Sequence, residues 1–114
     1  MNLEGVNMDK TEVVNEYFKY IVKIPAGIQY IADSLRTDKI PIALNEILNF
    51  SEGITWIKQM EEILTDQGVN TNLDKNQLDE FLNLINEGLE KQDFVLVADI
   101  FEYEVLPYFV KIVA

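Results

Sequence analysis

The residue types that most often carry enzyme chemistry are scarce in this sequence. It contains no Cys and no His. This excludes disulfides, thiol nucleophiles, Cys/His zinc sites, haem ligation through His or Cys, Ser-His-Asp triads and phosphorelay through His. Ser34 and Ser51 have no base partner that the sequence identifies, and the five Gly form no glycine-rich phosphate loop. Any catalysis would therefore depend mainly on carboxylates.

Two acidic pairs are the best candidates for such chemistry. Glu87 and Glu90 lie three residues apart, and so do Asp99 and Glu102. Carboxylates at this spacing project from one helix face, and two such pairs from neighbouring helices can hold Mg²⁺ through oxygen ligands. All-α nucleoside-triphosphate pyrophosphatases use Glu-rich motifs of this kind. A metal-dependent all-α hydrolase using these four residues is therefore the alternative interpretation.

The leading interpretation is a non-catalytic protein without a cofactor or bound metal. The spacing of the acidic pairs does not match the pyrophosphatase motifs, and no basic cluster is present to bind phosphates. The chain has 9 basic and 20 acidic residues, a formal charge of −11. This sign disfavours nucleic acids and anionic membranes. We expect an adaptor, a small chaperone-like protein or an antitoxin-like protein that binds a basic or amphipathic segment of another protein.

The C-terminal segment is the predicted partner-binding region. It has more apolar side chains than one buried helix face holds, so the excess needs further neighbours, a partner protein or a second copy in a homodimer. Alternatively, the segment is a central helix surrounded by others. The predicted apolar patch and its acidic rim consist of Glu102, Tyr103, Glu104, Leu106, Phe109 and Val110.

A third interpretation is a small-molecule binding module with an aromatic-lined pocket. Tyrosines are the candidate lining, although such residues also occur at the edge of a core with their hydroxyls in water. The five tyrosines are Tyr17, Tyr20, Tyr30, Tyr103 and Tyr108.

The elements that must position these residues are all predicted to be helices. Apolar residues recur at helical spacing nearly throughout, and runs of strict alternation are missing. Capping boxes predict helix starts at Asp9, with Glu12, and at Asp74, with Gln77. Pro25 and Pro41 are placed to open two further helices. The fold class is therefore all-α, a four- to five-helix bundle.

Several details of the helices follow from their sequences. The first helix is predicted to face the core with Val14, Phe18 and Ile21. The longest helix covers residues 41–66, and Gly53 is its weak point, where the sequence leaves open whether the helix kinks or breaks. Pro107 is expected to bend the last helix or divide it into 94–105 and 107–113. The predicted core includes Ile31, Ile47, Phe50, Ile54, Ile57, Ile85 and Phe101.

A faint internal repeat relates the two halves of the chain. A shift of 54 residues superimposes the stripe from Ile24 to Leu35 on the stripe from Leu78 to Leu89. The same shift superimposes Ile40–Ile47 on Phe94–Phe101. Each half then consists of a short helix, a tight turn and a longer helix, although any two helical hairpins share this outline.

The segment Val97–Pro107, with the sequence VADIFEYEVLP, resembles small, uncharacterised acidic helical proteins of clostridia and related Firmicutes. The turn Gly88–Phe94 and the segment Gly53–Ile57 are also similar to that group. The resemblance covers about residues 20 to 110. It implies an all-helical fold and no known activity.

The remaining expectations concern organisation and location. We expect residues 1–8 to be a flexible N-terminal tail and residues 9–114 to be a single helical domain. The N-terminus has neither a basic start nor an apolar run of signal-peptide length. The apolar C-terminal stretch carries Asp99, Glu102 and Glu104 in its middle, which argues against a membrane span. A cytoplasmic location is the expectation.

Overall fold

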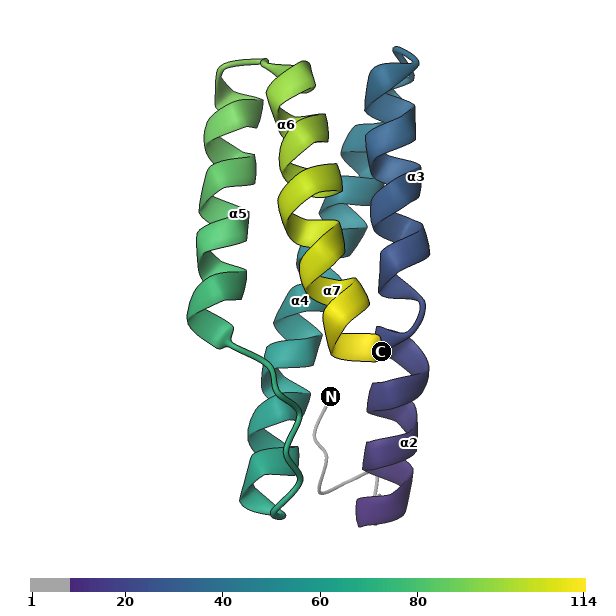
Figure 1. Cartoon of the computed structure of the whole chain (residues 1–114), viewed down its shortest axis with the longest axis vertical. Coiled ribbons are helices and arrows are strands. Elements are labelled where there is room, and N and C mark those ends of the chain that lie inside the picture. The colour runs from purple at the N-terminus through teal and green to yellow at the C-terminus, as the bar shows by residue number, and fades with distance from the viewer. Residues whose placement is uncertain (1–8) are drawn as a thin grey trace.

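Helices run side by side along the long axis of the molecule in the computed structural model, which describes residues 9–114 (Figure 1). The predicted tail, residues 1–8, lies outside the described residues. The described part measures 43 × 26 × 21 Å and contains no strand, so the all-α prediction is confirmed. The elements are α2 (Lys10–Ile21), α3 (Ile24–Arg36), α4 (Ile40–Asp66), α5 (Lys75–Glu90), α6 (Phe94–Ile100), η1 (Phe101–Val105) and α7 (Leu106–Val113).

The helices begin where local chemistry predicts. The Asp9 carboxylate accepts the backbone N–H of Glu12 at 2.8 Å. Asp74 caps α5 in the same manner, and Asp93 caps α6. Pro25 and Pro41 stand in the first turns of α3 and α4, where a missing N–H leaves no bond unmade.

The core lies between the rod formed by α2 and α3, the long helix α4, and the continuous rod α6–η1–α7. In Figure 1 this last rod lies between α5 and α3, and α4 lies behind them. Helix α3 contacts α4 and also contacts α6, η1 and α7. All seven predicted core residues are buried or, for Phe50, partly buried. In α4, the helix continues without a break through Gly53.

For α2, the predicted core residues Val14 and Phe18 are each one position after the residues that are buried, whereas Ile21 was predicted correctly. Val13, Tyr17 and Ile21 are buried, whereas Val14 is half-buried and Phe18 is exposed. Both sets satisfy helical spacing, and the position of α4 decides between them, because α2 packs on that helix.

Pro107 lies within the C-terminal rod without breaking it. The turn before it, η1, is a π-helix, and the N–H of Leu106 donates to the carbonyl of Phe101, five residues earlier. A proline has no N–H and its ring crowds the preceding turn of an α-helix. The wider π turn takes up this conflict at the junction, and α7 then continues to Val113.

The two turns that connect α3 to α4 and α5 to α6 have the same backbone geometry. In each, one residue has a positive φ, and the next residue donates its N–H to a carbonyl five residues earlier at 2.9 Å. The positive-φ residues are Asp38 (62°) and Gln92 (54°), and the donor–acceptor pairs are Lys39–Ser34 and Asp93–Gly88. All three correspondences have the 54-residue shift seen in the sequence.

Within residues 9–114, no helix has the length and apolar character needed to cross a membrane.

Candidate functional site

The predicted patch on the C-terminal rod is not a continuous apolar surface. Tyr103 is 65 % exposed and Val110 is 48 % exposed, but Phe109 is fully buried and Leu106 is half-buried. The placement of Phe109 in an exposed patch is therefore wrong. Its ring contacts Phe50, with a centroid separation of 6.4 Å, because this side of the rod faces the core. Of the predicted acidic rim, Glu104 is exposed and Glu102 is half-buried.

The four carboxylates of the alternative metal site do not converge. Arg36 of α3 takes two of them: its Nη2 lies 2.8 Å from Asp99 Oδ1 and its Nε lies 3.4 Å from Glu102 Oε1. Glu87 and Glu90 are exposed on α5. In the described part of the chain, no three acidic residues are grouped closely enough to hold a metal ion. Asp99 and Glu102 thus hold α6 and η1 to α3.

Arg36 also covers an aromatic ring. Its guanidinium carbon lies 5.9 Å from the centroid of Tyr103. Hydrogen bonding to Asp99 is the main cause that raises the pKa of Arg36. The most exposed aromatic residue of the predicted patch is therefore already engaged by a side chain of the same molecule.

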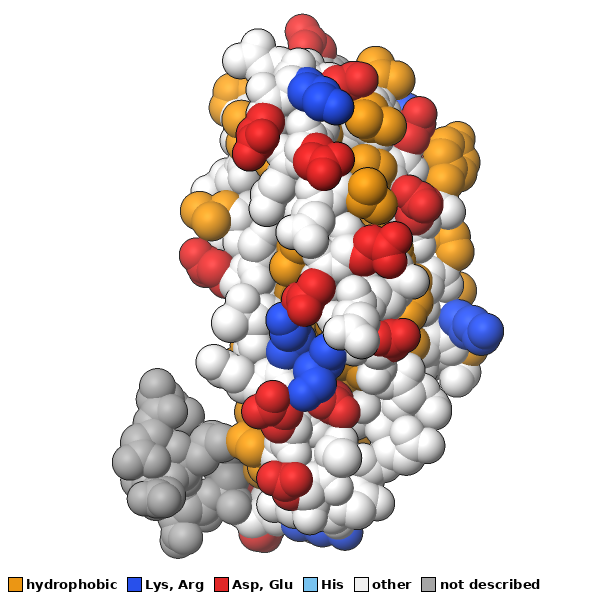
Figure 2. Space-filling view, turned by 90° about the vertical axis from the view of Figure 1, so that its left-hand side faces the viewer, with side chains coloured by type: hydrophobic (Ala, Val, Ile, Leu, Met, Phe, Trp, Pro, Cys, Tyr) orange, Lys and Arg blue, Asp and Glu red, His pale blue; other side chains and the backbone are white. Residues whose placement is uncertain are grey.

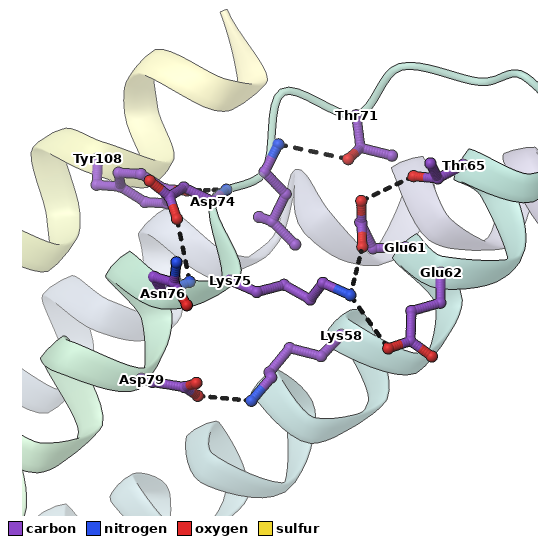
Figure 3. A network of polar contacts seen from close by, with 11 residues as sticks. Lys58, Glu61, Glu62, Thr65, Thr71, Asp74, Lys75, Asn76, Asp79 and Tyr108 are labelled. Carbon is purple, nitrogen blue, oxygen red and sulfur yellow. Dashed lines mark hydrogen bonds and ion pairs between the residues drawn. The ribbon is translucent and has the colours of Figure 1, made fainter.

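Figure 3 shows a second polar network, where the loop after α4 meets the start of α5. Lys75 Nζ lies 3.3 Å from Glu61 Oε2 and 3.1 Å from Glu62 Oε1. Glu61 also accepts the Thr65 hydroxyl at 2.8 Å and is nearly buried. Lys58 pairs with Asp79 nearby. Figure 2 shows the face of the molecule on which α5 lies, with basic side chains in its lower half and acidic side chains next to them. The network joins α4 to α5, which otherwise touch little.

Tyrosines complete the anchoring of this loop. The Tyr108 hydroxyl oxygen accepts the backbone N–H of Asp74 at 2.9 Å. The Tyr17 hydroxyl is fully buried and has no hydrogen-bond partner of good geometry among the described residues, although the Thr71 hydroxyl is near it. Burial raises the pKa of Tyr17 to about 12, and Thr71 opposes part of that rise. Both tyrosines are structural.

The five tyrosines do not line one common pocket. Tyr17 is in the core, Tyr30 and Tyr103 are exposed, and Tyr108 packs against Phe81. Tyr20 alone among them lines the small cavity between α3 and α4. That cavity has a volume of about 160 Å³ and is lined by Tyr20, Lys23, Ile24, Gly27, Ile28, Ile31, Glu46, Asn49 and Phe50.

Gly27 distinguishes this cavity from ordinary surface roughness. A Cβ at Gly53 would lie 2.0 Å from Tyr20 Oη, and one at Gly88 would lie 2.7 Å from Val97 Cγ2. Close packing therefore explains both of these glycines. A Cβ at Gly27 would meet nothing within 4 Å. Gly27 is exposed, and no close contact with the described residues explains why this helix position is Gly, which is about 1 kcal/mol less favourable than Ala in a helix interior. Its missing side chain leaves this part of the cavity lining open.

The cavity is lined by both apolar and charged residues. Its floor is made of isoleucines of α3 and the ring of Phe50. Lys23 and Glu46 also line it, and neither forms an ion pair with any residue in 9–114. Burial raises the pKa of Tyr20 above its ordinary value, so its hydroxyl, which is neutral at pH 7 in any case, ionises only at still higher pH. The cavity therefore combines an apolar lining with two charged side chains that no described residue pairs.

The sequence predicted the buried isoleucines that form the floor of this cavity, but it did not predict that a cavity opens above them. Ile24, Ile28 and Ile31 belong to the predicted stripe of α3. The available signal for the opening was Gly27, a glycine inside an otherwise strongly amphipathic helix. Glu46 and Asn49 reach the cavity only because α4 folds back beside α3.

Comparison with known proteins gives a family. A family model described as a domain of unknown function (DUF8042) matches residues 12–113. The chain belongs to this family. The match runs from α2 to α7, so the DUF8042 domain includes every element that forms the cavity. No curated protein and no solved structure matches the chain.

Proposed function

We propose that this DUF8042 protein is a non-catalytic protein-interaction module whose partner docks in the groove between α3 and α4. The observation that carries the proposal is the open cavity at Gly27, which the packing of the fold does not require. Its volume of about 160 Å³ suits one large side chain. For comparison, an engineered protein cavity of about 150 Å³ binds benzene.

Exposed apolar side chains lie at helical spacing from residues that line the cavity. Tyr30 is 50 % exposed and lies three residues after Gly27, so it lies on the same side of α3. Ile42 is 45 % exposed and lies four residues before Glu46 on the same side of α4. A groove of this kind between two helices fits an amphipathic helix that inserts its apolar face.

Charge indicates the nature of the partner. The chain carries a formal charge of −11. A field of this sign draws a basic partner and speeds its encounter. We therefore propose a partner segment that is apolar on one face and basic around it. A cytoplasmic location is part of the proposal, and fractionation of the native host tests it.

Affinity capture from the native host with matched variants tests the proposed function. Gly27→Leu fills the cavity, whereas Ala26→Leu places the same side chain at an exposed neighbouring position of α3. Val110→Glu tests the C-terminal patch. We expect one partner to be lost with Gly27→Leu and kept with Ala26→Leu and Val110→Glu. If Val110→Glu alone removes the partner, the groove is not the interface; if no variant changes the captured set, the proposed function is wrong.

A further inference from the structure

In the second helical hairpin, two positions that correspond to the cavity lining carry buried apolar side chains. Under the 54-residue shift, Gly27 corresponds to Phe81 and Glu46 corresponds to Ile100. Both Phe81 and Ile100 are buried, and the Phe81 ring packs against Tyr108 with a centroid separation of 5.4 Å. In the second hairpin, the chain therefore occupies with its own phenyl and aliphatic groups the positions that line a cavity in the first.

We infer that the cavity at Gly27 receives an aromatic side chain of the partner, with a lysine or arginine beside it that pairs with Glu46. This inference rests on the proposed function and specifies the partner's anchor. The volume of about 160 Å³ suits one ring, and the aromatic residues Phe50 and Tyr20 are part of the lining that an aromatic side chain would contact. Where the second hairpin has the apolar Ile100, the first has a carboxylate that no described residue pairs.

Lys23 is the competing charge at the same cavity. It lies more than 4.0 Å from every carboxylate in the described residues, Glu46 included, so it is free to attract an anionic partner. The net charge of −11 favours the cation, because the surrounding field repels an anion before it reaches Lys23. Whether the partner residue beside the aromatic side chain is cationic or anionic can therefore be measured separately from the binding of the ring.

Small probes separate these requirements. Benzyl alcohol carries the ring alone, benzylamine adds a cation, benzoate adds an anion, and butylamine carries a cation without a ring. Titration of each into the ¹⁵N-labelled chain is followed by amide chemical shifts. We expect the two non-anionic ring probes to shift the signals of Gly27 and Phe50, and butylamine to shift neither. Benzylamine should bind about fivefold more tightly than benzoate, as one partly exposed ion pair allows.

Variants locate the binding. Gly27→Leu should abolish the shifts caused by ring probes, whereas Ala26→Leu should retain them. Glu46→Gln should remove the advantage of benzylamine over benzyl alcohol and leave benzyl alcohol unchanged. Because Glu46→Gln keeps the length of the side chain, it tests the same site if Gly27→Leu fails to fold.

The outcomes distinguish this inference from the proposed function. If no ring probe binds while Gly27→Leu still abolishes partner capture, the aromatic anchor is wrong and the interaction function stands. If benzoate binds more tightly than benzylamine, the cationic neighbour is wrong. If the probes bind as expected but capture is insensitive to Gly27→Leu, the proposed function fails even though the cavity accepts a ring.

Discussion

The two helical hairpins, α3–α4 and α5–α6, have turns of the same geometry but different side chains at the position of Gly27 and Phe81. Their turns have the same hydrogen bonds and the same positive-φ position. The first hairpin has Gly27 beside an open cavity, and the second has Phe81 in the core. The two hairpins thus have the same turn geometry, but they differ in whether the corresponding position carries a buried side chain or lines an open cavity.

The largest expected effect on stability comes from removing the buried Phe81 ring of the second hairpin. Phe81→Ala removes a buried ring and should lower the free energy of unfolding by about 3–5 kcal/mol. Gly27→Leu, at the corresponding position, should cause a much smaller loss, because its Cβ meets nothing within 4 Å and its outer carbons reach the open cavity. Urea denaturation followed by circular dichroism measures both. A loss below about 1 kcal/mol for Phe81→Ala would mean that the second hairpin is not filled as described.

The next effect concerns the two glycines that packing requires. Gly88→Ala places a Cβ 2.7 Å from Val97 Cγ2, which is fully buried and cannot move aside. We expect a loss of about 1–3 kcal/mol. Gly53→Ala meets the far end of Tyr20, a side chain with room to swing outward, so its loss should be smaller. The reverse order in thermal denaturation would contradict this account of the hairpin contacts.

Gly27→Ala should have the opposite sign. Alanine removes the helix-propensity penalty of glycine without a clash, so stability should rise by about 1 kcal/mol. Ala26→Gly, on the exposed side of the same helix, should lower stability by a similar amount and serves as the matched control. If Gly27→Ala destabilises the chain, the cavity is smaller than the structure shows, and the case for a docking site weakens.

The smallest effects test whether the turns are equivalent. Asp38 and Gln92 have positive φ, which is unfavourable for residues other than Gly. Asp38→Gly and Gln92→Gly should each raise stability by about 0.5 kcal/mol, because Gly adopts this conformation without steric strain but loses more chain entropy. Differential scanning calorimetry should give matched shifts. A gain at one turn and a loss at the other would show that the turns differ energetically.

Local signals were sufficient for most of the fold. Asp9, Asp74 and the prolines at 25 and 41 mark helix starts through backbone chemistry that acts over three or four residues. The stripe of α3 predicted its buried face correctly. The face of α2 was wrong because Val13 and Val14 satisfy the same periodicity, and only contact with α4 separates them.

The candidate site depended on contacts that no local pattern contains. Glu46 joins Gly27 at one cavity only after α3 and α4 pack together. Asp99 and Glu102 look like a metal-binding pair along one helix, yet Arg36, more than 60 residues earlier, takes both. Charge alone therefore underlies the class of partner that we propose, while the position of the candidate site required the tertiary structure.

The π turn at η1 has a consequence for how the two halves of the chain align. Buried and partly buried residues of α4 match residues of the C-terminal rod with an interval of 54 up to the first residue of this turn and 55 from its last residue onward. The matched pairs are Ala43–Val97 and Ile47–Phe101 with the interval of 54, and Phe50–Val105 and Ile54–Phe109 with the interval of 55. A π turn holds one more residue than an α turn, so it acts as a one-residue insertion that the helix absorbs in place. If the two halves are aligned with a constant shift of 54 residues, the correspondence is lost after Phe101. With a shift of 55 residues, the buried side chains of the two halves correspond again.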